Sequence, residues 1–159
     1  EYLKQCVELE MINISRNSIT NLCELENCKK LVTLKCSRNN ISELRGLNSL
    51  PKLTSVAFAV NSVTSFTGLI NCPNLKTIYC RITKITSFDG LVYCPNVTRI
   101  RCYGNQITNI NGLSCAYLQN IWKTRDLIIA LASSDDQEMI RNYRGCKLFK
   151  RASLTSIST

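Results

Sequence analysis

Residues 31–52 read LVTLKCSRNNISELRGLNSLPK, and this pattern of residue types returns every 22 positions along most of the chain. Each unit opens on an aliphatic residue, at Leu9, Leu31, Leu53, Leu75 and Val97. An asparagine follows eight positions later, at Asn17, Asn39, Asn61 and Asn105, with Thr83 in the fourth unit. One such unit is too short to bury its own apolar row, but stacked units bury a continuous one. The period therefore predicts a solenoid, a fold that presents an extended surface for binding.

The start of each unit alternates apolar and polar residues, which predicts a short strand with one buried face. In the first unit, Ile12 and Ile14 should point inward while Asn13 points outward. The later part of the unit is rich in glycine, so we expect short 3₁₀ turns rather than long helices. A buried asparagine must find partners, and its amide can bond the turn backbone of neighbouring coils. Thr83 has one donor and a shorter reach, so the fourth coil should be the weak rung of this ladder.

The repeat L-x-x-L-x-L-x-x-N-x-I-x-x-L-x-x-L resembles leucine-rich repeats. Its length is similar to that of the short, phosphatase-1-regulator-like class, which ends in a C-terminal leucine-rich-repeat cap. The resemblance implies an α/β, right-handed solenoid with a parallel β-sheet on the concave face and short 3₁₀ or turn segments on the convex face. It implies five full repeats with partial ends in residues 1–126, and a helical cap in residues 127–159.

The predicted cap begins where the 22-residue period stops. Ser134 has the character of a helix N-cap, with acidic residues after it and Gly145 as a stop, so we expect a short helix over roughly 135–144. The residues around Tyr143 and Arg144 are similar to the capping segment of the short-repeat class. Such a cap would cover the apolar end of the solenoid and prevent aggregation.

Ten cysteines raise the question of disulfides or zinc. Seven of them fall in repeat positions that Ile14, Phe58 or Leu50 fill in other units: Cys6, Cys28, Cys36, Cys72, Cys80, Cys94 and Cys102. We therefore expect buried free thiols that act as small hydrophobic residues. With no C-x-x-C and no histidine, we predict no structural metal and no cofactor. Buried thiols favour a reducing compartment, so we predict a cytoplasmic or nuclear location.

The formal charge of +9 is unevenly distributed along the sequence. Residues 51–125 contain eight lysines and arginines and one acid, Asp89, which gives +7. The outward strand positions of the later repeats combine this charge with aromatic residues. The predicted partner-binding residues are Tyr79, Arg81, Arg99, Arg101, Tyr103 and Trp122, with Lys35 nearer the N-terminus. Tyrosine, tryptophan and arginine are the usual hot-spot residues of interfaces.

These patterns favour a non-catalytic scaffold or regulatory subunit that binds a partner protein with an acidic surface on the concave face. We expect no enzyme, because histidine is absent and no carboxylate pair falls on neighbouring strand positions. Apolar runs are too short for a membrane span, and no small-molecule substrate is indicated. The alternative is RNA binding, or a place in an RNA–protein particle, through the basic and aromatic patch. A bacterial or parasite surface protein is a third possibility, against which the free thiols argue.

Overall fold

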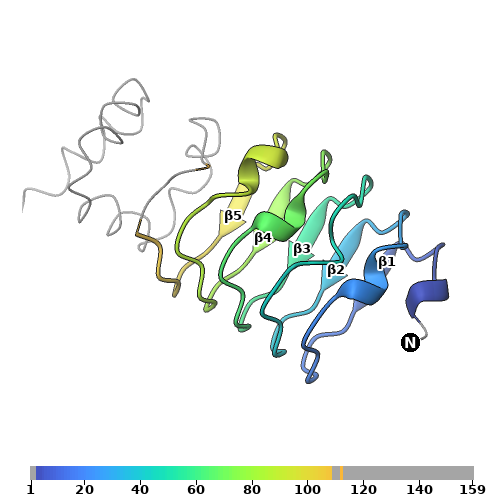
Figure 1. Cartoon of the computed structure of the whole chain (residues 1–159), viewed down its shortest axis with the longest axis horizontal. Helices are drawn as coiled ribbons and strands as arrows, with labels where there is room; N and C mark the ends of the chain where they lie inside the picture. Colours follow the sequence, from blue (N-terminus) through green and yellow to red (C-terminus); the bar gives the residue numbers. More distant parts are fainter. Residues whose placement is uncertain (1–2, 109–111, 113–159) are drawn as a thin grey trace, which may run out of the picture.

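A computed structural model describes residues 3–108 and 112, which form a stack of similar coils (Figure 1). Each coil contributes one short strand to a five-stranded parallel sheet with the order β1-β2-β3-β4-β5. The strands are β1 (Met11–Asn13), β2 (Thr33–Lys35), β3 (Ser55–Ala57), β4 (Thr77–Tyr79) and β5 (Arg99–Arg101). Four 3₁₀ helices complete the described elements: η1 (Leu3–Gln5), η2 (Cys23–Leu25), η3 (Thr67–Leu69) and η4 (Leu91–Tyr93).

The strand register confirms the period read from the sequence. Met11 pairs with Thr33, Thr33 with Ser55, Ser55 with Thr77, and Thr77 with Arg99, in steps of one repeat. Along β2, Thr33 is half-buried, Leu34 is buried and Lys35 is exposed, as the alternation predicted. The parallel-sheet solenoid is therefore confirmed, and the turn segments between strands are as short as the sequence indicated.

The interior is a continuous apolar core that runs the length of the stack. The aliphatic positions of the inner coils, including Leu31, Leu53 and Leu75, are fully buried. Phe66 contacts Phe58 edge-on at 6.4 Å between ring centroids and stacks on Phe88 at 6.0 Å. These rings link the third and fourth coils, so each of the two coils is stabilised by its neighbour as well as by its own contacts.

Six of the seven cysteines predicted to be core residues are buried: Cys28, Cys36, Cys72, Cys80, Cys94 and Cys102. Cys6 is only half-buried, because it precedes the first full coil and has a described coil on one side only. The cysteines in the described part of the chain form no disulfide with one another. The thiols of Cys72 and Cys94 donate to the carbonyl oxygens of Leu47 and Leu69, each at 3.1 Å.

The glycines of the turn segments are required by close backbone contact between coils. At Gly46, φ is +99°, and a Cβ added there would lie 2.1 Å from the carbonyl oxygen of Leu22 in the preceding coil. A side chain at this position would therefore separate the coils or distort the turn.

The asparagines form the predicted ladder between coils. Asn61 donates from Nδ2 to the carbonyl oxygens of Phe58 in its own coil (2.9 Å) and Cys36 in the coil before (3.1 Å). Its Oδ1 accepts the backbone N–H of Ile41 at 3.0 Å. Each internal asparagine therefore joins two coils through both ends of its amide.

Thr83 interrupts this ladder. Its hydroxyl bonds the Cys80 carbonyl oxygen at 3.0 Å and the side chain of Asn105, both away from the preceding coil. The bond to the Phe58 carbonyl oxygen is absent, and the backbone N–H of Val63 has no partner among the described residues. The junction between the third and fourth coils thus lacks the two amide bonds that its neighbours have.

The predicted cap, the helix over 135–144 and the partial sixth repeat lie outside the described residues. Within residues 3–108 and 112, no helix is long and apolar enough to cross a membrane.

Candidate partner-binding site

The outward side chains of the sheet form three ladders, which we call the sheet face. They are Met11, Thr33, Ser55, Thr77 and Arg99; Asn13, Lys35, Ala57, Tyr79 and Arg101; and Ser15, Ser37, Ala59, Arg81 and Tyr103. No acidic residue occupies any of these positions, whereas four are basic. The described acids, such as Glu43 and Asp89, lie elsewhere on the coils. The sheet face is therefore positively charged.

The sheet face carries two cation–π contacts, one between Arg101 and Tyr79 and one between Arg81 and Tyr103. We call these four residues the Tyr–Arg quartet. The guanidinium carbon of Arg101 lies 5.4 Å from the ring centroid of Tyr79, and that of Arg81 lies 5.4 Å from the centroid of Tyr103. Both contacts join neighbouring coils, because each partner is one repeat from the other. Such contacts contribute about 0.5–1 kcal/mol at exposed sites, enough to favour one arrangement of these side chains.

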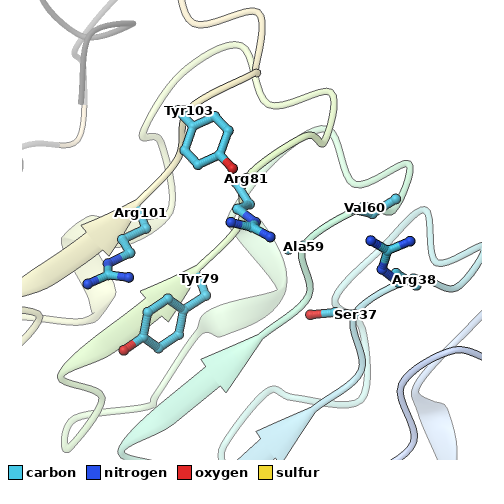
Figure 2. Close-up of a pocket in the computed structure, with 8 residues that line it drawn as sticks. All are labelled: Ser37, Arg38, Ala59, Val60, Tyr79, Arg81, Arg101 and Tyr103. Carbon is cyan, nitrogen blue, oxygen red and sulfur yellow. The ribbon is translucent and has the colours of Figure 1, made fainter.

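The quartet borders a hollow where the ladders change from small to large side chains. Figure 2 shows the eight residues that line it: Ser37, Arg38, Ala59, Val60, Tyr79, Arg81, Arg101 and Tyr103. The hollow is open to solvent and has a volume of about 220 Å³. Ala59, which is only 7% exposed, forms part of its floor. Without long side chains on β3, a partner can approach the sheet backbone here.

The structure brings four of the seven predicted site residues together. Tyr79, Arg81, Arg101 and Tyr103 line the hollow, while Arg99 and Lys35 are exposed on the sheet face outside its lining. Trp122 lies outside the described residues. These four residues lie at the ends of β4 and β5 or just after them, and their role in binding stays a prediction.

Sequence reasoning missed Arg38. This residue follows the third ladder position, where the backbone has a positive φ in every coil: Arg16, Arg38, Val60, Ile82 and Gly104. At Arg38, φ is 58°, and its backbone N–H bonds the Ala59 carbonyl oxygen at 2.8 Å. The left-handed conformation places Arg38 at the rim of the hollow rather than in a turn away from the sheet. The repeated position was visible in the sequence, but its conformation was not.

The buried thiols of Cys36 and Cys94 are poorly suited to nucleophilic or metal chemistry. Burial raises the pKa of the Cys36 thiol to about 12, and burial followed by the nearby Cys72 does the same for Cys94. Such thiols stay protonated at neutral pH, and the thiolate is the form that acts as nucleophile and metal ligand. No cluster of three or more potential metal ligands occurs within residues 3–108 and 112.

Comparisons with known proteins agree with this architecture. The family model described as leucine-rich repeats (two copies) matches residues 73–115, which span β4 and β5. The fold is therefore that of a leucine-rich repeat solenoid. A comparison with curated protein sequences finds no match.

Among solved structures, this leucine-rich repeat solenoid is similar to two internalins from Listeria monocytogenes. With an internalin (inlF) it shares 19% identity and a TM-score of 0.50, over 74% of this chain and 42% of that chain. With internalin C2 it shares 17% identity and a TM-score of 0.50, over 74% of this chain and 62% of that chain. At these identities the likeness establishes the fold alone. The solenoid also spans less than two thirds of either internalin chain.

Proposed function

We propose that this leucine-rich repeat solenoid is a non-catalytic scaffold or regulatory subunit that binds a partner protein on its sheet face. Leucine-rich repeat proteins are generally interaction scaffolds, which supports the class of function. The observation that carries the proposal is the Tyr–Arg quartet beside the hollow. It supports a partner with an acidic surface, centred on β4 and β5.

The quartet has the physical properties of an interface hot spot. Tyrosine and arginine contribute most when they are held in place and surrounded by a flat, water-excluding rim. Each guanidinium already rests on a ring, so binding a carboxylate orders little that is not ordered in the free protein. The small residues of β3, including Ser55 and Ala57, let a partner lie close to the sheet beside them.

RNA binding is the competing function, and the geometry supports it less well. Single-stranded RNA is held by aromatic rings on which bases stack. On the sheet face the aromatic residues are Tyr79 and Tyr103, and a guanidinium lies over each ring. An acidic protein surface uses the guanidiniums without displacing them, so we favour a protein partner.

Two further features belong to this proposal. The absence of disulfides among the cysteines of residues 3–108 supports a reducing compartment, cytoplasm or nucleus, as the place where the solenoid works. We also propose that residues 1–126 form the repeats and that residues 127–159 form a helical cap of the short-repeat class.

A pull-down from native lysate, with and without RNase, tests the proposed function. The test variant reverses three charges on the sheet face, Arg81→Glu, Arg99→Glu and Arg101→Glu. The matched control reverses three exposed basic residues away from the strands, Arg45→Glu, Lys52→Glu and Lys84→Glu. We expect a protein that is retained by the wild type and the control, is lost with the test variant, and is insensitive to RNase.

Equal loss with both triple variants would mean that net charge, and not the quartet, drives binding, which contradicts the proposal. Loss of every partner on RNase treatment would instead establish the RNA function. Thermal melts of both variants are needed beforehand, since an unfolded test variant would lose its partner trivially.

A further inference from the structure

Three arginines, from the second, fourth and fifth coils, line the hollow beside the quartet. Arg38 follows β2, Arg81 follows β4, and Arg101 ends β5, while Ala59 of the third coil lies between Arg38 and Arg81 in Figure 2. No carboxylate lines the hollow, and none of the three arginines forms an ion pair within the described part of the chain. This is more positive charge than a single carboxylate needs, because one guanidinium satisfies both carboxylate oxygens in a bidentate pair.

The remaining lining residues add hydroxyl donors. Ser37, Tyr79 and Tyr103 each carry a hydroxyl group that can donate to an oxyanion. Tyr103 is 40% exposed and Ala59 is 7% exposed, so the donors surround a shallow apolar floor. Guanidinium groups in a fixed arrangement, supplemented by hydroxyl donors, suit an anion with several oxygens and more than one negative charge.

We propose that the hollow is a binding site for a phosphorylated side chain of the partner protein. This inference rests on the proposed function and specifies the chemistry of the partner. A phosphorylated serine or threonine carries a charge of about −1.5 to −2 at neutral pH and three acceptor oxygens, which matches several guanidiniums better than one carboxylate does. A hollow of about 220 Å³ that is open on one side holds one such group with its side chain attached.

A phosphorylated protein segment fits the hollow better than a nucleic-acid backbone. RNA presents phosphates in series and needs a continuous basic track, whereas the third coil, between Arg38 and Arg81, contributes only Ala59 and Val60 to the hollow. The neighbouring part of the sheet face towards the N-terminus has small, neutral residues at Ser55 and Ala57 and a single charge at Lys35. A segment with one phosphoryl group and few other charges is consistent with that distribution.

Fluorescence anisotropy with labelled peptides and the full chain tests the inference. The probes are Gly-Ala-Gly-Xaa-Gly-Ala-Gly, with phosphoserine, glutamate or serine at the central position. We expect the phosphoserine peptide to bind at least about tenfold more tightly than the glutamate peptide, and the serine peptide not to bind. Inorganic phosphate at millimolar concentration should compete for the site.

Two arginine variants locate the site. Arg38→Ala should weaken the phosphoserine peptide about tenfold or more, because it removes one wall of the hollow. Arg99→Ala removes the same charge from the same sheet but does not line the hollow, so it should have a much smaller effect. Melting curves establish that both variants are folded.

The inference is overturned if the glutamate and phosphoserine peptides bind alike, or if Arg99→Ala weakens binding as much as Arg38→Ala. Oligouridine that binds more tightly than the phosphoserine peptide, with the same dependence on Arg38, would also overturn it and assign the hollow to nucleic acid. If the peptides bind alike while the captured protein still requires Arg81, Arg99 and Arg101, only this inference fails. If capture of that protein does not require Arg81, Arg99 and Arg101, the proposed function fails as well.

Discussion

Replacing Thr83 with asparagine should stabilise the solenoid, because it restores the interrupted rung of the ladder. The neighbouring rung provides the geometry. There, Asn61 accepts the Ile41 N–H at 3.0 Å and donates to the Cys36 carbonyl oxygen at 3.1 Å. An asparagine at position 83 would offer the same two bonds to the Val63 N–H and the Phe58 carbonyl oxygen, one repeat further along.

The expected gain follows from those two bonds and from the bond that is lost. Each intramolecular hydrogen bond contributes about 0.5–1.5 kcal/mol net, and satisfying a donor that was unpaired adds to this. The substitution also removes the hydroxyl bond from Thr83 to Asn105. We therefore expect a net gain of about 1 kcal/mol in the free energy of unfolding, which is roughly 2–4 °C in Tm for a chain of this length.

Urea unfolding followed by circular dichroism measures this gain, and the reciprocal variant is its control. Asn61→Thr introduces the same defect into an intact rung and should lower the unfolding midpoint by a comparable amount. Thr83 is 7% exposed in a position that asparagine occupies in other coils, so no steric penalty is expected. The account of the ladder is refuted if Thr83→Asn folds but is no more stable than the wild type, and if Asn61→Thr has the unfolding midpoint of the wild type.

Three further outcomes follow from the packing. Gly46→Ala should destabilise by more than about 2 kcal/mol, because its Cβ would lie 2.1 Å from the Leu22 oxygen; Gly104→Ala, whose nearest neighbour would be 3.1 Å away, should cost less in the same thermal melts. Burial raises the pKa of the Cys36 thiol to about 12 from 9.0, so the unfolded state loses this proton at a lower pH than the folded state does. The free energy of unfolding should therefore not depend on this group below about pH 9 and should fall as the pH rises towards 12, with a shallower fall in Cys36→Ala. Deleting residues 140–159 should cause aggregation visible by light scattering; a soluble monomer would contradict the capping role predicted from the sequence.

The repeat architecture was predictable because it depends on which residues are buried, and burial follows the period of the chain. Leu34, Val56 and Ile78 are a repeat apart, and each is fully buried on its strand. The asparagine ladder was predictable for the same reason, since its partners are backbone groups that recur with the period. Thr83 was identifiable as its weak point because a hydroxyl cannot replace both ends of an amide.

The candidate site was only partly predictable. The outward strand positions placed Tyr79, Arg81, Arg101 and Tyr103 on neighbouring rungs, but not the crosswise pairing, which depends on the direction of each long side chain. Arg38 was missed because its place at the hollow depends on a left-handed backbone conformation that arginine adopts infrequently.

The sequence by itself therefore determined the stack of coils, its parallel sheet and its core, since hydrophobic residues repeated at a fixed spacing are buried together when the repeats stack on one another. It also determined which residue types face solvent on each strand. Only the tertiary structure decided that three arginines from different coils line one hollow. Their place around it depends on the backbone torsion at Arg38 and on the small side chain of Ala59 between Arg38 and Arg81, and the repeat pattern specifies neither.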